Sequence, residues 1–395
     1  MISRLKIGNL TMYIKRVALK NWRNFRSAES ELSQVSYILG ANAAGKSNFL
    51  DIFRFLRDIA KSEGGGLQKA VNDRGGVSKL RCLHARNDTE IRLEVSFVDK
   101  LEDEEVIWKY ILGFKPEGKG KHRNIISCEE VWYKGVNKLS RPDKKDKADL
   151  LLLTETALEQ TRANKDFREI SDFFQNITYL HLVPQLLKYG EKIGGNRIED
   201  DPFGQGFLER LAKTPERTRN SRLTKIGKAL SQAVPQFKEL RFIKDEMGHP
   251  HLEAKYEHHR PNAGWQREDS FSDGTLRLLG ILWSLQDSNG LLLLEEPELS
   301  LNQAVVEQIP LLIDRVLKGN RKNKRQIFIT THSKDLLSNR GIDSNSILIL
   351  KSEKEGTSIN SVSDNDKIAL EAGLSVADVI LPQTRPVLIE QLGLW

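Results

Sequence analysis

Hydrophobic and polar residues are arranged along this chain with two periodicities, one typical of strands and one typical of helices. Residues 90–97 alternate at every second position, which predicts a half-buried strand. Uninterrupted apolar runs at 35–39 and 291–294 predict strands buried on both faces, as in a parallel sheet. Helical spacing follows at 48–56. The same patterns predict helices at 154–174, 223–233 and 272–285, and strands at 13–19, 106–112, 125–133, 237–243, 252–256, 326–330 and 346–350.

The pattern changes twice, and these changes divide the chain into three segments. Residues 1–140 contain a strand, a helix and several alternating strands, which predicts an antiparallel meander. A polar stretch of Lys and Asp at 143–147 lies at the start of the segment 141–235, which is mainly helical in pattern. Residues 236–395 return to strands and helices. The sequence therefore predicts an α/β fold with an inserted, mainly helical lobe, and it shows no internal repeat and no sustained heptads.

The composition is that of a globular protein with a sizeable core. Hydrophobic residues make up 39% of the 395 residues and charged residues 29%. No apolar run has the length of a membrane span, so no membrane partner is expected. The two cysteines fit neither a metal site nor a disulfide framework, which favours a reducing, cytoplasmic location. The residues before Met12 are interpreted as an unstructured leader or an upstream start.

Basic residues are concentrated in three runs, and the net charge is +7. The runs lie at 115–123, 141–147 and 318–325. Such runs attract polyanions, although each of them can also be a solvated loop between two elements. Together they make DNA or RNA a plausible partner without identifying it.

A phosphate-binding loop is the most informative motif. Residues 40–47, Gly-Ala-Asn-Ala-Ala-Gly-Lys-Ser, match G-x-x-x-x-G-K-[ST] at every fixed position, between a predicted strand and a predicted helix. The glycines let backbone N–H groups surround a triphosphate at the N-terminus of the helix. Lys46 would reach the outer phosphates and Ser47 would bind Mg²⁺, which predicts ATP and Mg²⁺ as cofactors. The predicted cofactor-binding residues here are Gly40, Asn42, Ala43, Ala44, Gly45, Lys46, Ser47 and Asn48.

Two acids follow the buried strand at 291–294. Glu295 would hold Mg²⁺, and Glu296 would orient and deprotonate the attacking water. Glu295 is one methylene longer than the Asp usual at this position. An acidic pair at a strand end is often only a solvated loop, but the presence of the phosphate-binding loop favours catalysis.

Two further segments carry polar residues at the ends of predicted elements. His332 follows the strand at 326–330 and could hydrogen-bond the γ-phosphate or the attacking water. Residues 271–277 open a helix, with Ser272 or Asp273 as its N-cap. A Ser-x-Gly segment at a helix start can also bind an anion, which makes Ser272 and Gly274 candidate phosphate ligands.

In their order along the chain, these four motifs resemble those of the ABC ATPase family. The resemblance implies an ABC ATPase head, a mixed sheet with a phosphate-loop core and an antiparallel β meander. Residues 1–140 would carry the loop, and 141–235 the helical insert. Residues 236–395 would carry the D-loop, the signature (Ser272 and Gly274), Walker B (Glu295 and Glu296) and the switch histidine (His332). It also implies a head-to-tail dimer in which Ser272 and Gly274 of one copy cap the γ-phosphate bound to the other. Leu299 to Asn302 is similar to the D-loop, and Gln68 is a weak match for the Q-loop glutamine.

Within this family, the long span between Ser47 and Phe271 resembles RecF and the OLD-type ATPases. The segment 21–25, Asn-Trp-Arg-Asn-Phe, and the Glu-Pro-Glu-Leu sequence from Glu296 to Leu299 support this branch. OLD-type proteins carry a Toprim nuclease, but 387–390 only resembles the beginning of a Toprim strand, and 364–366 is interpreted as a polar turn.

The resemblance implies an ATPase that regulates a separately encoded nuclease or effector in anti-phage defence, with DNA as the trigger. The alternatives are a RecF-like DNA repair ATPase and, less favoured, a transporter ATPase subunit. A metal site built from His249, His251, His258 and His259 is disfavoured, because their spacing matches no known pattern.

Overall fold

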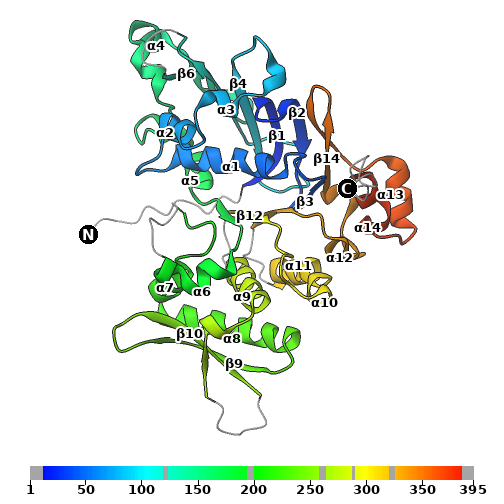
Figure 1. Cartoon of the computed structure of the whole chain (residues 1–395). Helices are drawn as coiled ribbons and strands as arrows, with labels where there is room; N and C mark the ends of the chain where they lie inside the picture. Colours follow the sequence, from blue (N-terminus) through cyan, green and yellow to red (C-terminus); the bar gives the residue numbers. More distant parts are fainter. Residues whose placement is uncertain are drawn as a thin grey trace, which may run out of the picture.

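The computed structural model describes residues 12–118, 123–193, 200–257, 264–286, 290–319 and 325–384. Three sheets and their covering helices form the described structure (Figure 1). Five stretches named above lie outside these residues: 1–11, 119–122 and 320–324 inside two of the basic runs, His258 with His259, and 387–390.

The first sheet is antiparallel throughout, with strand order β2-β1-β4-β5-β6-β7. It confirms the predicted meander. Its strands are β1 Tyr13–Trp22, β2 Phe25–Glu31, β4 Ile91–Val98, β5 Trp108–Pro116, β6 Asn124–Tyr133 and β7 Val136–Arg141.

The second sheet has the order β15-β14-β3-β13-β12-β8 and is parallel except for β15. The strand before the phosphate-binding loop, β3, lies between β13 and β14, both from the C-terminal part of the chain. Because the strands are parallel, the loops that follow β3, β12 and β13 meet at one edge of the sheet. The strands are β3 Val35–Gly40, β8 Thr178–Leu180, β12 Leu291–Glu295, β13 Gln326–Thr330, β14 Ile347–Glu353 and β15 Gly356–Asn360.

Helices cover both faces of the parallel sheet. Helix α1 lies between the two larger sheets (Figure 1), where Phe49 and Phe53 pack in a core that also includes Leu293. On the opposite face Leu292 packs with Ile313 of α11 in a second core. The helices are α1 Lys46–Ala60, α2 Leu67–Asn72, α3 Val77–Leu80, α4 Lys144–Ala148, α5 Arg168–Gln175, α6 Pro184–Ile193, α7 Phe207–Lys213, α8 Glu216–Ala233, α9 Asp273–Leu285, α10 Gln303–Val306, α11 Ile309–Gly319, α12 Lys334–Leu337, α13 Asp364–Glu371 and α14 Val376–Val379.

A third core joins α7, α8 and α9 to a small sheet of order β11-β10-β9. The strands are β9 Phe237–Lys244, β10 Pro250–Tyr256 and β11 Gln266–Arg267. This lobe lies below the parallel sheet in Figure 1. The predicted insert contributes to all three cores, because Leu158 and Phe174 pack with α1, Leu180 packs with β12, and Leu223 packs with α9. The division at 140 and 235 stays a prediction.

Two local predictions are wrong. The helix predicted at 154–174 is a loop followed by a 3-10 turn and α5, because the buried Glu129 carboxylate accepts hydrogen bonds from the backbone N–H groups of Ala157 and Leu158. Residues 364–366 are not a turn but the first turn of α13, which is capped by Ser363. Asp and Asn suit both settings, so composition alone did not separate them.

Candidate nucleotide-binding site

The loop at 40–47, which we call the P-loop, has the backbone that its glycines permit. Ala43 and Gly45 have positive φ angles of 63° and 102°. A Cβ atom at Gly45 would lie 2.1 Å from Nδ2 of Asn24, so the position tolerates no side chain. Helix α1 begins at Lys46, directly after this turn. Backbone N–H groups therefore surround a position at the N-terminus of a long helix, where an anion is favoured.

Lys46 is mostly buried, and its Nζ donates to the carbonyl oxygens of Gly40 at 2.8 Å and Ala41 at 3.2 Å. Burial lowers the pKa of Lys46, while the nearby Glu296 and Glu295 act in the opposite direction. A cation held over the loop in this way fits a triphosphate, whose oxygens would replace the two carbonyls as acceptors.

The P-loop is supported from behind by residues distant in sequence. Asn24 Nδ2 donates to the Ala44 carbonyl at 3.0 Å, and its Oδ1 accepts from Asn48 Nδ2 at 2.8 Å. Thr357 of β15 donates to the same Ala44 carbonyl at 3.0 Å. Trp22 donates its indole N–H to the Asn48 carbonyl. The segment 21–25 is therefore structural support for the loop, and Asn48 faces this support.

Residue alternation on β12 directs Glu295 toward α1. Leu291 and Leu293 pack in the core beneath that helix, and Glu295 continues the same face. Its Oε1 accepts a hydrogen bond from Ser47, and its Oε2 accepts one from Tyr179 of β8. Burial and the neighbouring Glu295 raise the pKa of Tyr179, so its hydroxyl stays protonated and donates. The oxygens of Ser47 and Glu295 are the hard ligands that Mg²⁺ prefers, so the donor set fits this ion.

Glu296 and His332 also meet at this sheet edge. Glu296 has a positive φ of 43°, and its N–H donates to the Thr330 carbonyl at 3.0 Å. Its Oε1 lies 3.1 Å from His332 Nδ1. Both side chains are partly exposed, with 25% and 49% of their surface accessible. The pair is accessible to substrate as well as to solvent.

Glu298 fixes the loop that carries His332. Its Oε1 accepts from the Thr331 hydroxyl at 2.6 Å and from the His332 N–H at 3.4 Å. Burial raises the pKa of Glu298, and Thr331 acts in the opposite direction. Sequence reasoning did not assign this acid a role, although it lies two residues after Glu296.

Of the two predicted candidates, Ser272 is the N-cap of α9, and its Oγ accepts from the Thr275 N–H at 3.1 Å. Gly274 lies against the D-loop, where an added Cβ would be 2.7 Å from the Ser300 carbonyl oxygen. Among the described residues, the hydrogen bonds of Ser272 do not extend to the P-loop of the same chain. The structure thus brings together the P-loop, Glu295, Glu296 and His332, but not Ser272 and Gly274.

The close approach of Gly274 to Ser300 gives a testable prediction. A methyl group at position 274 would displace a backbone atom, so Gly274→Ala should lower stability by about 1–3 kcal/mol. Gly227, inside α8, provides the matched control because its added Cβ would meet no atom closer than 3.8 Å. Gly227→Ala should raise stability by up to about 1 kcal/mol. Thermal unfolding of both variants should therefore show midpoint shifts of opposite sign.

Gln68, the weak match for the Q-loop glutamine, does not join this site, and neither do the histidines of the disfavoured metal site. The Gln68 side chain hydrogen-bonds the backbone of Asn124 and Thr154. It therefore positions β6 rather than binding a phosphate. His251 pairs with Glu268 at 2.8 Å and His249 with Asp245 at 3.3 Å. The described residues contain no cluster of three or more potential metal ligands.

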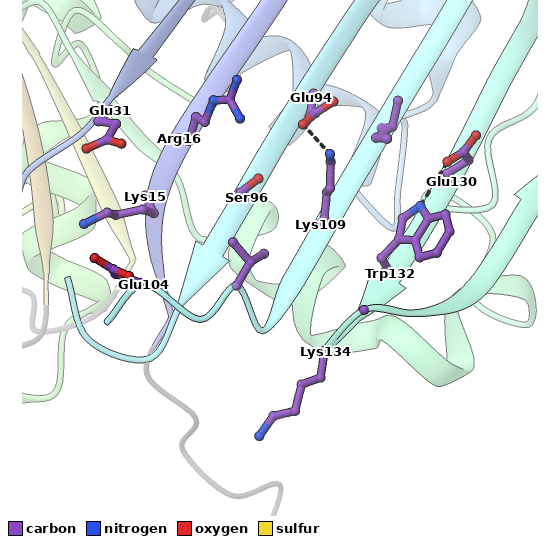
Figure 2. A pocket seen from close by; sticks show the side chains of 13 residues that line it. Lys15, Arg16, Glu31, Glu94, Ser96, Glu104, Lys109, Glu130, Trp132 and Lys134 are labelled. Atoms are coloured by element: carbon purple, nitrogen blue, oxygen red, sulfur yellow. Dashed lines mark hydrogen bonds and ion pairs between the residues drawn. The ribbon is translucent and has the colours of Figure 1, made fainter. Parts of the chain in front are cut away.

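A concave surface lies on the antiparallel sheet (Figure 2). Lys109 pairs there with Glu94 at 2.6 Å, and Trp132 donates to Glu130 at 2.9 Å. Basic and acidic groups alternate across the hollow, so it offers no continuous positive track for a nucleic-acid backbone. Its charged lining residues are Lys15, Arg16, Lys109, Lys134, Glu31, Glu94, Glu104 and Glu130.

No helix in the described part of the chain is both long and apolar enough to cross a membrane.

The fold is that of an ATPase head of the ABC/SMC type, which confirms the predicted ABC ATPase fold. The family described as "AAA domain, putative AbiEii toxin, Type IV TA system" matches residues 35–339. The chain belongs to that family. No curated protein sequence matches it.

Solved structures show the same fold at low sequence identity. An Smc head bound to the C-winged helix domain of ScpA superposes with a TM-score of 0.53 at 15% identity, over 89% of this chain and 99% of the other. An Smc head with an extended coiled coil, bound to the C-terminal domain of ScpA and derived from Pyrococcus furiosus, has a TM-score of 0.50 at 14% identity, over 91% and 99%.

Proposed function

We propose that this protein binds and hydrolyses ATP with Mg²⁺ and uses the cycle to regulate a partner protein. One observation carries the proposal: Lys46 and Ser47 lie at the same sheet edge as the Glu295, Glu296 and His332 side chains. A phosphate-binding loop next to two carboxylates and a histidine is the arrangement needed to transfer a phosphoryl group to water.

Each residue has a distinct task in this reaction. Lys46 leaves the two loop carbonyls and neutralises the outer phosphates. Ser47 and Glu295 would hold Mg²⁺, which supplies charge neutralisation on the phosphate oxygens. Glu296 accepts a proton from the attacking water. His332, 3.1 Å from Glu296, orients that carboxylate and contacts the γ-phosphate.

The remaining phosphate ligands would come from a second copy of the chain. Ser272 and Gly274 stand at the N-terminus of α9 and make no hydrogen bond to their own P-loop among the described residues. In a head-to-tail dimer they would cap the nucleotide held by the other copy, as the resemblance to ABC ATPases implies. ATP binding would then close the dimer and hydrolysis would open it.

The partner would be a separately encoded nuclease or other effector, acting in anti-phage defence in the cytoplasm. The family description, which refers to a toxin and a type IV toxin–antitoxin system, supports a role in a multi-protein defence system. The two Smc heads above are each bound to a domain of ScpA, which illustrates that this fold can bind a domain of another protein. DNA would be the trigger, with the exposed Lys144, Lys145 and Lys147 as candidate contacts.

Mixing two inactive variants tests the composite site. Lys46→Ala damages the P-loop half and Ser272→Arg the signature half, so each alone should be inactive. Mixed dimers retain one intact site, and activity should return to about a quarter of the wild-type value. Phosphate release is the measurement.

The control mixes Lys46→Ala with Glu296→Gln. Both changes lie in the same half of the composite site, so no mixed dimer contains an intact site. Equal activity of both mixtures would contradict the head-to-tail arrangement.

A further inference from the structure

Both oxygens of the Glu295 carboxylate have a partner in this structure. Ser47 donates to Oε1, and Ser47 belongs to the P-loop itself. Tyr179 donates to Oε2 from outside every motif described above. In the proposed function Ser47 and Glu295 both become ligands of one metal ion, whereas Tyr179 can keep its bond. Tyr179 is therefore the lasting partner of this carboxylate.

The fold places Tyr179 on the strand next to the one that carries Glu295. Strand β8 pairs with β12 in parallel, with Tyr179 opposite Leu293. Both residues face the core under α1, and Glu295 lies two residues further along the same face of β12. The Tyr179 hydroxyl thus arrives beside the acid at the end of the neighbouring strand.

A cation from α1 fixes the tyrosine ring. The Arg54 guanidinium lies 4.1 Å from the ring centroid of Tyr179. Arg54 is also 3.8 Å from the buried Asp51, so its own position is set by an ion pair. Helix α1 therefore supplies both Ser47 at its start and the group that orients Tyr179 two turns later.

We propose that Tyr179 is a positioning residue that holds the Glu295 carboxylate in one orientation for the metal ion of the nucleotide. This inference rests on the proposed function. Glutamate has one more rotatable bond than the aspartate usual at this position, so its carboxylate can adopt more orientations. The hydrogen bond from Tyr179 removes that freedom, much as an outer partner orients a metal ligand. The longer acid and the tyrosine act as a unit.

Manganese binding tests the proposal without requiring turnover. Mn²⁺ can replace Mg²⁺ at oxygen ligands, and electron paramagnetic resonance reports its free and bound forms. Tyr179→Phe keeps the ring and its contact with Arg54 but removes the donor. In the presence of ATP it should weaken Mn²⁺ binding by about tenfold or more, whereas ATP binding without metal should change little.

Tyr110→Phe provides a matched control in the same chain. Tyr110 is buried and donates to Glu129 at 3.1 Å in the antiparallel sheet. Removing that hydroxyl deletes a tyrosine–glutamate hydrogen bond without touching the nucleotide site. The variant should unfold at a lower temperature, and its Mn²⁺ affinity should equal that of the wild type.

Shortening the acid gives a second route to the same answer. In Glu295→Asp the carboxylate cannot reach both Ser47 and Tyr179, so this single substitution should already lower the Mn²⁺ affinity. Adding Tyr179→Phe to it should then cause no further loss. Additive losses, or a Tyr179→Phe protein with wild-type Mn²⁺ affinity, would overturn the role of Tyr179. A wild-type protein that binds no Mn²⁺ with ATP would overturn the proposed function as well.

Discussion

Replacing Glu296 with Gln is expected to lower the rate of ATP hydrolysis by about 10²–10⁴-fold. The amide has nearly the shape of the carboxylate but cannot accept a proton from the attacking water. Its oxygen can still meet His332, which lies 3.1 Å from the native carboxylate. ATP affinity should therefore remain near the wild-type value. Phosphate release and equilibrium binding of ATP are the two measurements.

Glu239→Gln is the control, because it makes the same chemical change at an exposed position on β9. It should leave turnover unchanged. Glu296→Gln should also trap the ATP-bound dimer, so affinity purification from the source cells should recover its companion. Recovery of neither a dimer nor a nuclease would contradict the regulatory part of the proposal. Recovery of DNA repair proteins instead would favour the RecF-like alternative.

Replacing Asp51 with Ala should cost about 3–5 kcal/mol of stability. Asp51 is a buried acid on α1 that pairs with Arg74 at 2.9 Å and with Arg23 at 2.6 Å. Its removal would leave Arg74 buried with one carboxylate fewer, because Asp58 at 2.9 Å is its other partner. Thermal or denaturant unfolding measures the loss. Asp73→Asn is the control, since its pair with Lys69 is exposed and should contribute less than about 1 kcal/mol.

The same acid makes stability depend on pH. Burial on its own would raise the pKa of Asp51, but Arg74, Arg23 and Arg54 together hold that pKa below its ordinary value. The stabilisation is therefore fully present above the unfolded-state pKa, about 3.9 for Asp, and is lost as pH falls through the lower folded-state pKa. The stability difference between the wild type and Asp51→Ala should be constant near neutral pH and should shrink below about pH 4. An undiminished difference in acid would contradict this assignment.

The parts of the site that the sequence predicted are those encoded by short contiguous motifs. The P-loop, the acids after 291–294 and the strand before His332 each combine an apolar run with a polar end, and a parallel sheet gathers such ends at one edge. The predicted strands β4, β9 and β10 lie within two residues of their observed bounds for the same reason, a clear local pattern.

The missed residues depend on pairing between distant segments. Tyr179 lies on a strand of three residues inside a region with a helical pattern, and only its pairing with β12 gives it a role. The short run of strand-favouring residues from Ile177 to Leu180 was the available signal. The Thr357 hydroxyl donates to the Ala44 carbonyl although the two residues are 313 positions apart. No local pattern encodes such a contact.

The placement of β3 has a consequence for biosynthesis. Its two neighbours, β13 and β14, are translated about 290 and 310 residues later. While the protein is being made, the strand that leads into the P-loop therefore emerges from the ribosome with both edges unpaired, and its apolar side chains lack their final cover. Ribosome-bound chains that end before β13 should thus be the ones that chaperones protect, and the ability to bind nucleotide should arise only in the last stage of synthesis.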